Sequence, residues 1–270
     1  MIPKLEGLRQ RCAAAFDDRL TGRVDQFVVI EFLDGGGMGD LYRVREDGLD
    51  RELVMKVMST RLRVDLRAES RFLREARITG MLQHPNIVPV YGRGTAKLPS
   101  GILVPYYTMR PLTGGTLARR LREDPSFSSG TVAHRIDAYL PIIEGVCDAL
   151  VCAHRRGIVH RDVKPDNVML EDGHQVLLCD WGLAFEPGSV GEHDAPQAVT
   201  DHAPGANRSE PGVHRPTAPG GTPAYAPPEQ MDGSGPLGPW SDVYSLGAIL
   251  AEILLGTFPS GDATSVLSGD

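Results

Sequence analysis

The chain has 270 residues, of which 41% are hydrophobic and 23% are charged. These values are typical of a globular protein, and the length allows one or two domains with a sizeable core. The formal net charge of −7 argues against nucleic acid as the main partner.

Cysteine usage and the N-terminus indicate a cytoplasmic location. The cysteines show no paired spacing of the kind that binds metals, which favours reduced thiols. The N-terminus is charged too early for a signal peptide, and we expect no membrane segment in this chain. The four cysteines are Cys12, Cys147, Cys152 and Cys179.

The first hundred residues predict a short helix, a hairpin and a second helix. Apolar residues recur at helical spacing over residues 5–16 and predict a short amphipathic helix. Apolar stretches at 27–32 and 41–44 flank a glycine run and predict two strands of a hairpin. The next strand, 53–58, contains Lys56, and a helix over 66–79 contains Glu75, with Gly80 as its predicted stop.

The middle of the chain predicts a strand, a loop and a long helix. Residues 105–117 combine an apolar strand with a glycine-rich turn, and 124–130 predict a loop. A helix ending at Gly157 follows, and we expect its apolar residues to be core. These are Ile136, Tyr139, Leu140, Ile143, Val146, Cys147, Leu150 and Val151. The apolar run at 243–255 is too short for a membrane span and carries Glu252, so we expect a buried core helix.

The chemistry concentrates in residues 158–167, which read Ile-Val-His-Arg-Asp-Val-Lys-Pro-Asp-Asn. Asp180-Trp181-Gly182 begins thirteen positions after Asn167. Transfer of a phosphoryl group to a hydroxyl needs a carboxylate near that hydroxyl and cations at the phosphates. Asp162 fits the first need, and the oxygens of Asn167 and Asp180 suit Mg²⁺. A solvated charged loop is the alternative for either motif alone.

Together these motifs resemble the catalytic loop and metal-binding turn of a bacterial, eukaryotic-like protein serine/threonine kinase. The resemblance covers residues 25–260. It implies an α+β, two-lobed fold with a small antiparallel sheet lobe plus one helix and a larger, mainly helical lobe. The implied division is an N-terminal extension at 1–24, the small lobe at 25–110, the partial large lobe at 111–260 and a disordered tail at 261–270.

The resemblance also implies residue roles, with ATP and Mg²⁺ as cofactors. Lys56 would hold the α- and β-phosphates and pair with Glu75. Asp162 would act at the reacting hydroxyl, Lys164 would touch the γ-phosphate as a point charge, and Asn167 and Asp180 would bind the metal. Met109 would be the gatekeeper, and Arg110 and Leu112 would meet adenine through their backbones. The implied nucleotide-binding residues are Gly35, Gly36, Gly37, Gly39, Leu41, Val54, Lys56, Met109, Arg110, Leu112 and Met169.

The segment 221–229, Gly-Thr-Pro-Ala-Tyr-Ala-Pro-Pro-Glu, resembles the substrate-docking end of the family's activation segment. Thr222 with Lys164 matches members that act on serine and threonine, and the resemblance implies that Asp242 bonds backbone N–H groups around His160.

The chain departs from the family pattern at four points. Asp34 stands at the first glycine position of the phosphate loop, Val54 replaces a small alanine, and Trp181 replaces the usual phenylalanine. The family has several more helices after the one at 243–255, so either the chain is a fragment or its large lobe is incomplete, and we expect a partly bare core helix and an unpaired Glu229 carboxylate. None of the first three departures removes a group that does chemistry.

Residues 186–221 hold six prolines and six glycines, so we expect a mobile activation-segment insertion there. Its histidines fit no metal spacing. The resemblance implies that Arg161 pairs with a phosphate in this segment, which predicts autophosphorylation within 200–217, foremost at Thr217.

Three functions stay open from the sequence. The first is a protein serine/threonine kinase that uses MgATP on protein hydroxyls, with possible self-association for autophosphorylation. The second is a pseudokinase or a nucleotide- or partner-binding module, which Asp34, Val54 and the short large lobe favour. The third is a small-molecule kinase, which segment 221–229 disfavours.

Overall fold

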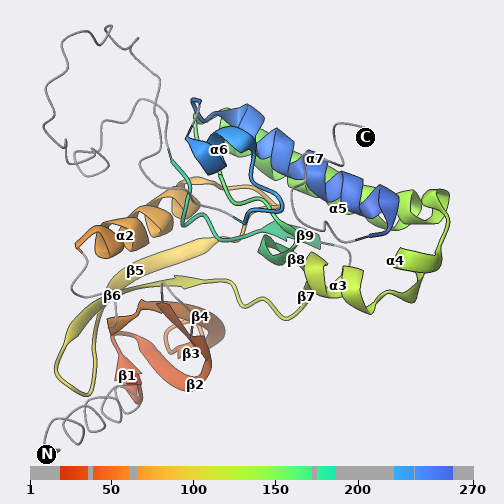
Figure 1. The fold of residues 1–270 in the computed structure, drawn as a ribbon. Helices are drawn as coiled ribbons and strands as arrows, with labels where there is room; N and C mark the ends of the chain where they lie inside the picture. The colour runs from red at the N-terminus through yellow and green to blue at the C-terminus, as the bar shows by residue number, and fades with distance from the viewer. Residues whose placement is uncertain are drawn as a thin grey trace, which may run out of the picture. The chain divides into compact units, whose positions relative to one another are not determined.

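The computed structural model of the chain describes residues 19–35, 39–60, 66–171, 175–185, 222–233 and 235–257. The chain divides into two compact units, each treated by itself below (Figure 1). Unit 1 comprises Met1–Gly80 and Pro89–Pro111, and unit 2 comprises Met81–Val88 and Leu112–Asp270. The predicted helix at 5–16, the insertion at 186–221 and the tail at 261–270 lie outside the described residues.

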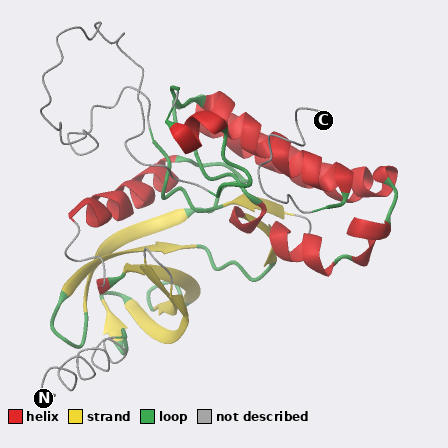
Figure 2. Ribbon diagram, in the orientation of Figure 1, coloured by secondary structure: helices red, strands yellow, loops and turns green. Residues whose placement is uncertain are grey.

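Unit 1 is a six-stranded antiparallel sheet with one described helix (Figures 1 and 2). The strand order is β1-β2-β3-β4-β6-β5, so β5 is an edge strand. The predicted hairpin is confirmed as the antiparallel pair β2 and β3. The strands are β1 (Arg23–Val24), β2 (Phe27–Gly35), β3 (Gly39–Glu46), β4 (Arg51–Met58), β5 (Val90–Lys97) and β6 (Leu103–Met109), and the helix is α2 (Leu66–Met81).

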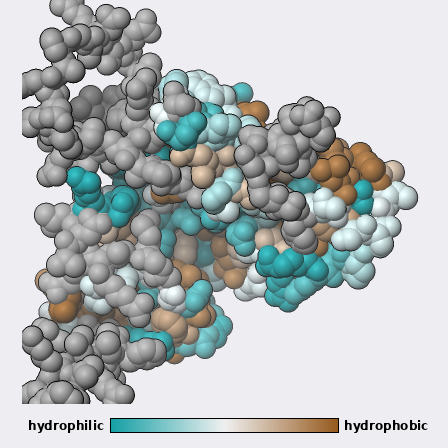
Figure 3. All heavy atoms as spheres, viewed as in Figure 1, coloured by the Kyte–Doolittle hydropathy of each residue, from teal (hydrophilic) through white to brown (hydrophobic). Residues whose placement is uncertain are grey.

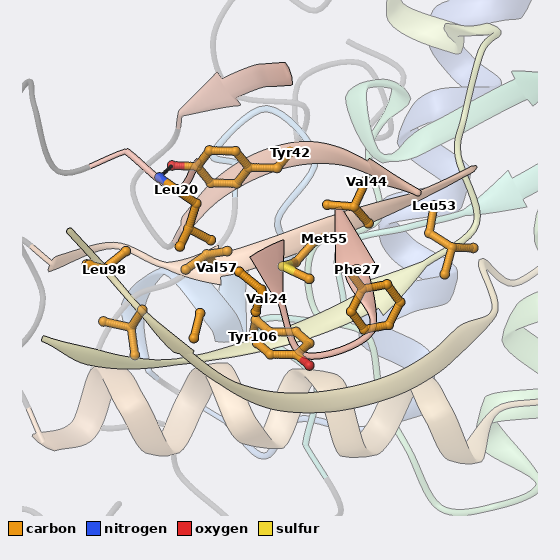
Figure 4. Close-up of a cluster of buried hydrophobic side chains, with 12 residues drawn as sticks. Leu20, Val24, Phe27, Tyr42, Val44, Leu53, Met55, Val57, Leu98 and Tyr106 are labelled. Carbon is orange, nitrogen blue, oxygen red and sulfur yellow. Dashed lines mark hydrogen bonds between the residues drawn. The ribbon is translucent and has the colours of Figure 1, made fainter. Parts of the chain in front are cut away.

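Strand β4 separates two apolar clusters because successive side chains of a strand point to opposite faces. Met55 and Val57 belong to a twelve-residue cluster whose side chains point toward one another in Figure 4. Met58 packs in the second cluster with Phe72 and Ala76 of α2. Lys56 lies between Met55 and Val57 in the alternation, so it shares the sheet face of α2.

The predicted end of the helix at Gly80 is wrong. Helix α2 runs through Gly80 to Met81, and a Cβ built on Gly80 would meet only Val90 at ordinary contact distance. Glycine ends a helix where the backbone turns left-handed, and Gly80 keeps a negative φ.

Unit 2 is mainly helical, with a three-stranded sheet of order β7-β8-β9. The predicted α+β class is therefore confirmed. The strands are β7 (Gly115–Thr116), β8 (Val168–Glu171) and β9 (Gln175–Leu178). The helices are α3 (Leu117–Glu123), α4 (Pro125–Ser129), α5 (Val132–His154), the 3₁₀ turn η2 (Pro165–Asn167), α6 (Pro228–Asp232) and α7 (Pro239–Leu255).

The loop predicted at 124–130 is wrong, because α4 occupies most of it. The Asp124 carboxylate accepts the Ser126 N–H at 2.9 Å and caps the helix, and Pro125 stands at its first position. Proline at that position suits a helix start, since its missing N–H has no partner there anyway.

Half of the residues predicted as core on α5 are exposed, which corrects that prediction. Tyr139, Ile143, Val146 and Leu150 are buried, whereas Ile136, Leu140, Cys147 and Val151 are exposed. The apolar residues of α5 therefore form two faces, and only one packs against the rest of unit 2.

Helix α7 confirms the predicted helix at 243–255 but is buried on one side only. Ile249 and Ile253 are buried, whereas Val243 and Leu255 are more than half exposed. Apolar side chains gather on the surface of unit 2 where α5 begins and α7 ends (Figure 3). Among the described residues, no helix is both long and apolar enough to cross a membrane.

Buried Arg135 fixes the end of α7 onto the start of α5. Its guanidinium donates to the carbonyl oxygens of Phe127, Gly130 and Leu254 at 3.1, 2.6 and 2.8 Å. Gly256 ends α7 with a φ of 66°, and a Cβ there would lie 2.6 Å from the Phe127 carbonyl oxygen. A cation at a helix C-terminus also interacts favourably with the helix dipole.

Candidate active site

The structure brings Lys56 and Glu75 together in unit 1. Lys56 Nζ donates to Glu75 Oε1 at 2.7 Å, and the two side chains are 15% and 3% exposed. The Tyr107 hydroxyl donates to the same oxygen at 2.8 Å. Tyr107 faces Lys56 across β4 and β6, so one buried carboxylate oxygen fixes the lysine head beside the sheet. Glu75 Oε2 is buried and has no hydrogen-bond partner among the described residues.

The other implied nucleotide-binding residues divide between the units. Gly35, Gly39, Leu41, Val54, Met109 and Arg110 lie in unit 1, Leu112 and Met169 lie in unit 2, and Gly36 and Gly37 lie outside the described residues.

The structure also shows what surrounds Gly39, Val54 and Asp34 on strands β2, β3 and β4. Gly39 must be glycine, because a Cβ there would lie 2.6 Å from the Val57 carbonyl oxygen. Val54 is 8% exposed and faces Met109 across β4 and β6. Exposed Asp34 accepts the N–H of Gly35 at 2.8 Å.

The structure also gathers four polar side chains in unit 2. Lys164 Nζ donates to Asp162 Oδ2 at 2.8 Å and to Thr222 Oγ1 at 2.9 Å. The Thr222 hydroxyl lies 3.4 Å from Asp162 Oδ1 as a donor. Asn167 Nδ2 donates to the Asp162 carbonyl oxygen at 2.8 Å and to Asp162 Oδ2 at 3.1 Å. Asp162 is thus a carboxylate that holds a hydroxyl on one oxygen and a lysine on the other.

Asp242 of α7 holds the backbone that presents Asp162. Its carboxylate accepts the N–H groups of His160 and Arg161 at 2.9 and 2.8 Å, and His154 Nε2 lies 2.7 Å from it. Arg161 has a φ of 70°, a left-handed conformation that costs free energy for a non-glycine residue. The fully buried Asp242 carboxylate offsets this cost with charge-assisted hydrogen bonds.

His160 has a structural role rather than a chemical one. Its Nδ1 accepts the Asp162 N–H at 3.2 Å, and its Nε2 lies 3.0 Å from the Cys179 carbonyl oxygen. A carbonyl oxygen can only accept, so Nε2 is the donor in this contact and Nδ1 is the acceptor in the other. Its ring also contacts Trp181, with centroids 4.5 Å apart. Trp181 is 1% exposed, so unit 2 has room for the larger aromatic residue.

Asn167 and Asp180 lie at the same end of the β8–β9 hairpin. Asn167 directly precedes β8, and the Cys179 N–H, one residue before Asp180, donates to the Asn167 carbonyl oxygen at 2.9 Å. The Asn167 amide nitrogen is used by Asp162, which leaves its side-chain oxygen for a cation. Asp180 is exposed and has a φ of 60°. One amide and one carboxylate oxygen fit Mg²⁺, which binds few protein oxygens and keeps several waters.

The described residues form no site for a soft metal ion. They contain no group of three or more His, Cys, Asp or Glu side chains that could hold a metal. Burial raises the pKa of the Cys179 thiol to about 12, with Asp180 and Glu171 adding to the shift. This thiol therefore stays protonated and uncharged at neutral pH, so Cys179 behaves like a small apolar side chain.

Three contacts after residue 222 were not predicted. The Tyr225 hydroxyl donates to Glu252 Oε2 at 2.9 Å, and Gln230 Nε2 donates to the Arg161 carbonyl oxygen at 2.7 Å. Ser241 Oγ donates to Glu229 Oε1 at 3.2 Å, so the expectation of an unpaired Glu229 carboxylate is wrong. Only Glu252 gave a signal in the sequence, as an acid inside an apolar run.

Comparisons with known proteins agree with this geometry. The family model described as "Protein kinase domain" matches residues 27–267. Among curated proteins, serine/threonine-protein kinase PknB of Mycolicibacterium smegmatis is 36% identical over 235 residues, which are 87% of this chain and 33% of that protein. PknB of Mycobacterium tuberculosis H37Rv is 35% identical over 240 residues, covering 88% of this chain and 34% of that protein.

A third relative comes from a different bacterial group. Serine/threonine-protein kinase PknD of Chlamydia pneumoniae is 32% identical over 243 residues, which are 87% of this chain and 25% of that protein. The chain therefore spans a quarter to a third of the length of these curated relatives. From the family match and the Asp162 and Lys56 geometry, the chain belongs to the protein kinase domain family, and its relatives are serine/threonine-protein kinases.

Proposed function

We propose that this chain transfers the γ-phosphate of MgATP to serine and threonine hydroxyls of proteins. The observation that carries the proposal is the hydroxyl of Thr222, which lies 2.9 Å from Lys164 Nζ and 3.4 Å from Asp162 Oδ1. This arrangement shows that a hydroxyl fits beside a carboxylate and a cation in unit 2. A substrate hydroxyl needs the same two partners to become a nucleophile.

Each residue then has its own role in phosphoryl transfer. MgATP, when bound, supplies the phosphoryl group. Asp162 orients the substrate hydroxyl and accepts its proton, and Lys164 stabilises negative charge that develops next to it. Asn167 and Asp180 would hold Mg²⁺ through oxygen atoms.

Lys56 would bind phosphate oxygens as a point charge, and Glu75 keeps its head in place. Their pairing at 2.7 Å supports this role, because a lysine held by a buried carboxylate is pre-organised for its ligand. We also propose residues 25–110 and 111–260 as the two lobes, with protein substrates, a cytoplasmic location and self-association during autophosphorylation.

A second candidate is a nucleotide- or partner-binding module without efficient catalysis. Val54 favours it, because two extra methyl groups relative to alanine take space on the sheet face where adenine would lie. Asp34 favours it less, since its exposed carboxylate is screened by solvent and already accepts the Gly35 N–H.

The test compares nucleotide binding and phosphate transfer in the same sample. Calorimetric titration with MgATP measures binding, and transfer of labelled γ-phosphate to a generic basic protein measures catalysis. Binding with transfer that disappears in the Asp162→Asn variant supports the kinase. Binding without transfer supports the second candidate, and transfer that survives in Asp162→Asn contradicts the assigned role of Asp162.

A further inference from the structure

Glu171, the last residue of β8, makes two contacts that the proposed chemistry does not use. Its Oε1 accepts the backbone N–H of Gly114 at 2.7 Å, and its Oε2 accepts the Thr113 hydroxyl at 3.3 Å. Both partners directly precede β7, and all three residues belong to unit 2. One carboxylate therefore holds the two residues that follow Leu112 in the chain.

The register of β7 and β8 explains the contact with Gly114. The two strands are antiparallel, and the first backbone pair places Gly115 opposite Leu170 (Figure 1). Continued by one step, this register places Gly114 opposite Glu171, but the backbone pairing does not extend that far. The Glu171 side chain binds the N–H group at which the pairing stops. A hydrogen bond from an N–H group to a carboxylate is stronger than one to a neutral acceptor.

Gly114 approaches β8 so closely that only glycine fits. A Cβ there would lie 1.7 Å from the Leu170 carbonyl oxygen. Gly115 follows directly, and glycine has a wider choice of backbone angles than any other residue. The contact with Glu171 therefore restrains a stretch of backbone that two glycines would otherwise leave flexible.

This restraint bears on Leu112, which lies two residues before Gly114. The family resemblance implies that the Leu112 backbone meets adenine. Pro111 precedes it, and the proline ring fixes φ at that position, so restrained residues stand on both sides of Leu112. Met169, another implied nucleotide-binding residue, lies on β8 two positions before Glu171. The strand that carries Glu171 thus also carries part of the proposed nucleotide site.

We propose that Glu171 is a positioning residue for the nucleotide, because it holds the Leu112 backbone in the conformation that recognises the adenine ring. It acts through the backbone of Thr113 and Gly114. Its loss should therefore weaken adenine binding and leave the hydroxyl chemistry of Asp162 intact. This inference rests on the proposed function, since it requires a nucleotide that binds through adenine.

Substitutions at this contact should have graded effects on MgATP affinity. Glu171→Leu removes both acceptor oxygens at similar size and should weaken binding about tenfold. Glu171→Gln keeps a side-chain oxygen that can accept the Gly114 N–H, so its loss should be smaller. Thr113→Val removes only the longer contact and should change affinity less than about twofold. Glu144→Gln, at an exposed acid of α5, is the matched control.

Two ligands and one assay separate positioning from a general loss of structure. Calorimetric titration measures the affinity of each variant for MgATP and for adenosine, which has the adenine ring without the phosphates. We expect Glu171→Leu to lose the same factor for both ligands. In the transfer assay its KM for MgATP should rise by that factor, while kcat stays within about twofold of the parent. Thermal unfolding confirms that each variant is folded.

Hydrogen exchange tests the contact itself without any nucleotide. The Gly114 amide should exchange slowly in the parent and in Glu171→Gln, and much faster in Glu171→Leu. Equal Gly114 exchange in the parent and in Glu171→Leu would show that Glu171 does not restrain this backbone.

The affinities distinguish failure of this inference from failure of the proposed function. Parental affinity of Glu171→Leu for both ligands overturns the role of Glu171 alone, and so does a fall in kcat at unchanged affinity. A parent that binds MgATP without transferring phosphate contradicts the proposed kinase, whereas weaker binding by Glu171→Leu would still support the positioning role. A parent that binds neither ligand overturns both.

Discussion

At the residue scale, each unit contains a carboxylate that holds a lysine. Glu75 is 3% exposed and holds Lys56, whereas Asp162 is 9% exposed and holds Lys164. A buried charge without its partner costs several kcal/mol, because desolvation is no longer offset. The two pairs therefore serve stability as well as chemistry, and substitutions at them must separate the two effects.

The Lys56 and Glu75 pair permits that separation. Lys56→Met should lower phosphate transfer about a hundredfold or more and also destabilise unit 1, because it leaves the Glu75 carboxylate buried with only Tyr107. Lys56→Met combined with Glu75→Gln should regain stability but not transfer. Chemical denaturation and a transfer assay measure both, with exposed Lys97→Met of β5 as the control. Normal transfer in either Lys56 variant would show that Lys56 does not bind phosphates.

Substitution of Asp162 and substitution of Asp180 should impair different properties of the protein. Asp162→Asn removes the group that accepts the hydroxyl proton, so MgATP affinity should persist while turnover falls. Asp180→Asn removes a metal ligand, so Mg²⁺-dependent nucleotide affinity should fall as well. Titration of nucleotide with and without Mg²⁺ checks this prediction. Equal losses of metal-dependent affinity in both variants would contradict the division of roles.

Glu252 should make stability fall with rising pH. Burial raises its pKa from 4.5 to about 7, with Asp166 adding to the shift and the Tyr225 hydrogen bond opposing it. The folded state therefore favours the protonated acid, and its stabilisation is complete below pH 4.5 and lost as pH rises to about 7. The loss is up to about 3 kcal/mol.

Denaturation of the parent and Glu252→Gln across this pH range measures the effect. The variant should lack the decline that the parent shows, and exposed Glu144→Gln should keep it. A parent whose stability relative to Glu252→Gln does not change with pH would rule out the raised pKa.

At the scale of elements, α7 supports the catalytic loop through one side chain. Asp242 accepts two backbone N–H groups and contacts His154, as described above. An asparagine there can accept one of these N–H groups but turns its own NH₂ toward the other. Asp242→Asn should cost about 2–4 kcal/mol of folding free energy and lower transfer with it, because Asp162 loses its support.

The control for this prediction is Val243→Asn, the exposed neighbour on the same helix, which should change neither property. Circular dichroism during denaturation and the transfer assay give the two readings. An Asp242→Asn variant with parental stability and transfer would show that α7 does not hold the loop.

Elements with strong periodicity were predictable from the sequence, and those set by local capping or by tertiary packing were not. The hairpin around Gly39 and the strand of Lys56 follow from apolar alternation and glycine placement. Helix α4 depends on the Asp124 cap, and a short polar stretch of sequence does not predict such a cap. The exposure of Ile136 and Leu140 on α5 depends on which face finds a partner, and periodicity marks apolar residues on both faces.

The candidate site was predictable because its residues lie close together in sequence within two motifs. Asp162, Lys164 and Asn167 fall within six positions, so local spacing fixes their proximity. The contacts of Asp242 with His160 and of Tyr225 with Glu252 join distant segments. No local sequence pattern predicts the Tyr225 contact, whereas the resemblance to kinases predicted the Asp242 contact.

At the scale of the whole molecule, we predict autophosphorylation between residues 200 and 217, which lie outside the described residues. Arg161 is held beside Asp162 by Asp242 and is the cation that a phosphate there would pair with. Thr217 is the foremost candidate, and transfer should rise as phosphate accumulates. Thr222 is excluded, because its hydroxyl is bonded to Lys164.

Mass spectrometry after incubation with MgATP locates the phosphate, with Asp162→Asn as the inactive control. Thr217→Val should remove the rise in transfer. An active sample without phosphate between 200 and 217 would refute this prediction.

The central claim is that Asp162 activates a protein hydroxyl for phosphate transfer. The most direct measurement is the rate of labelled γ-phosphate transfer from MgATP to a basic protein substrate by the parent and by Asp162→Asn at equal nucleotide saturation. We predict phosphoserine and phosphothreonine from the parent and a rate at least about a hundredfold lower from the variant. Equal rates, or saturating nucleotide binding with no transfer by the parent, would contradict the account.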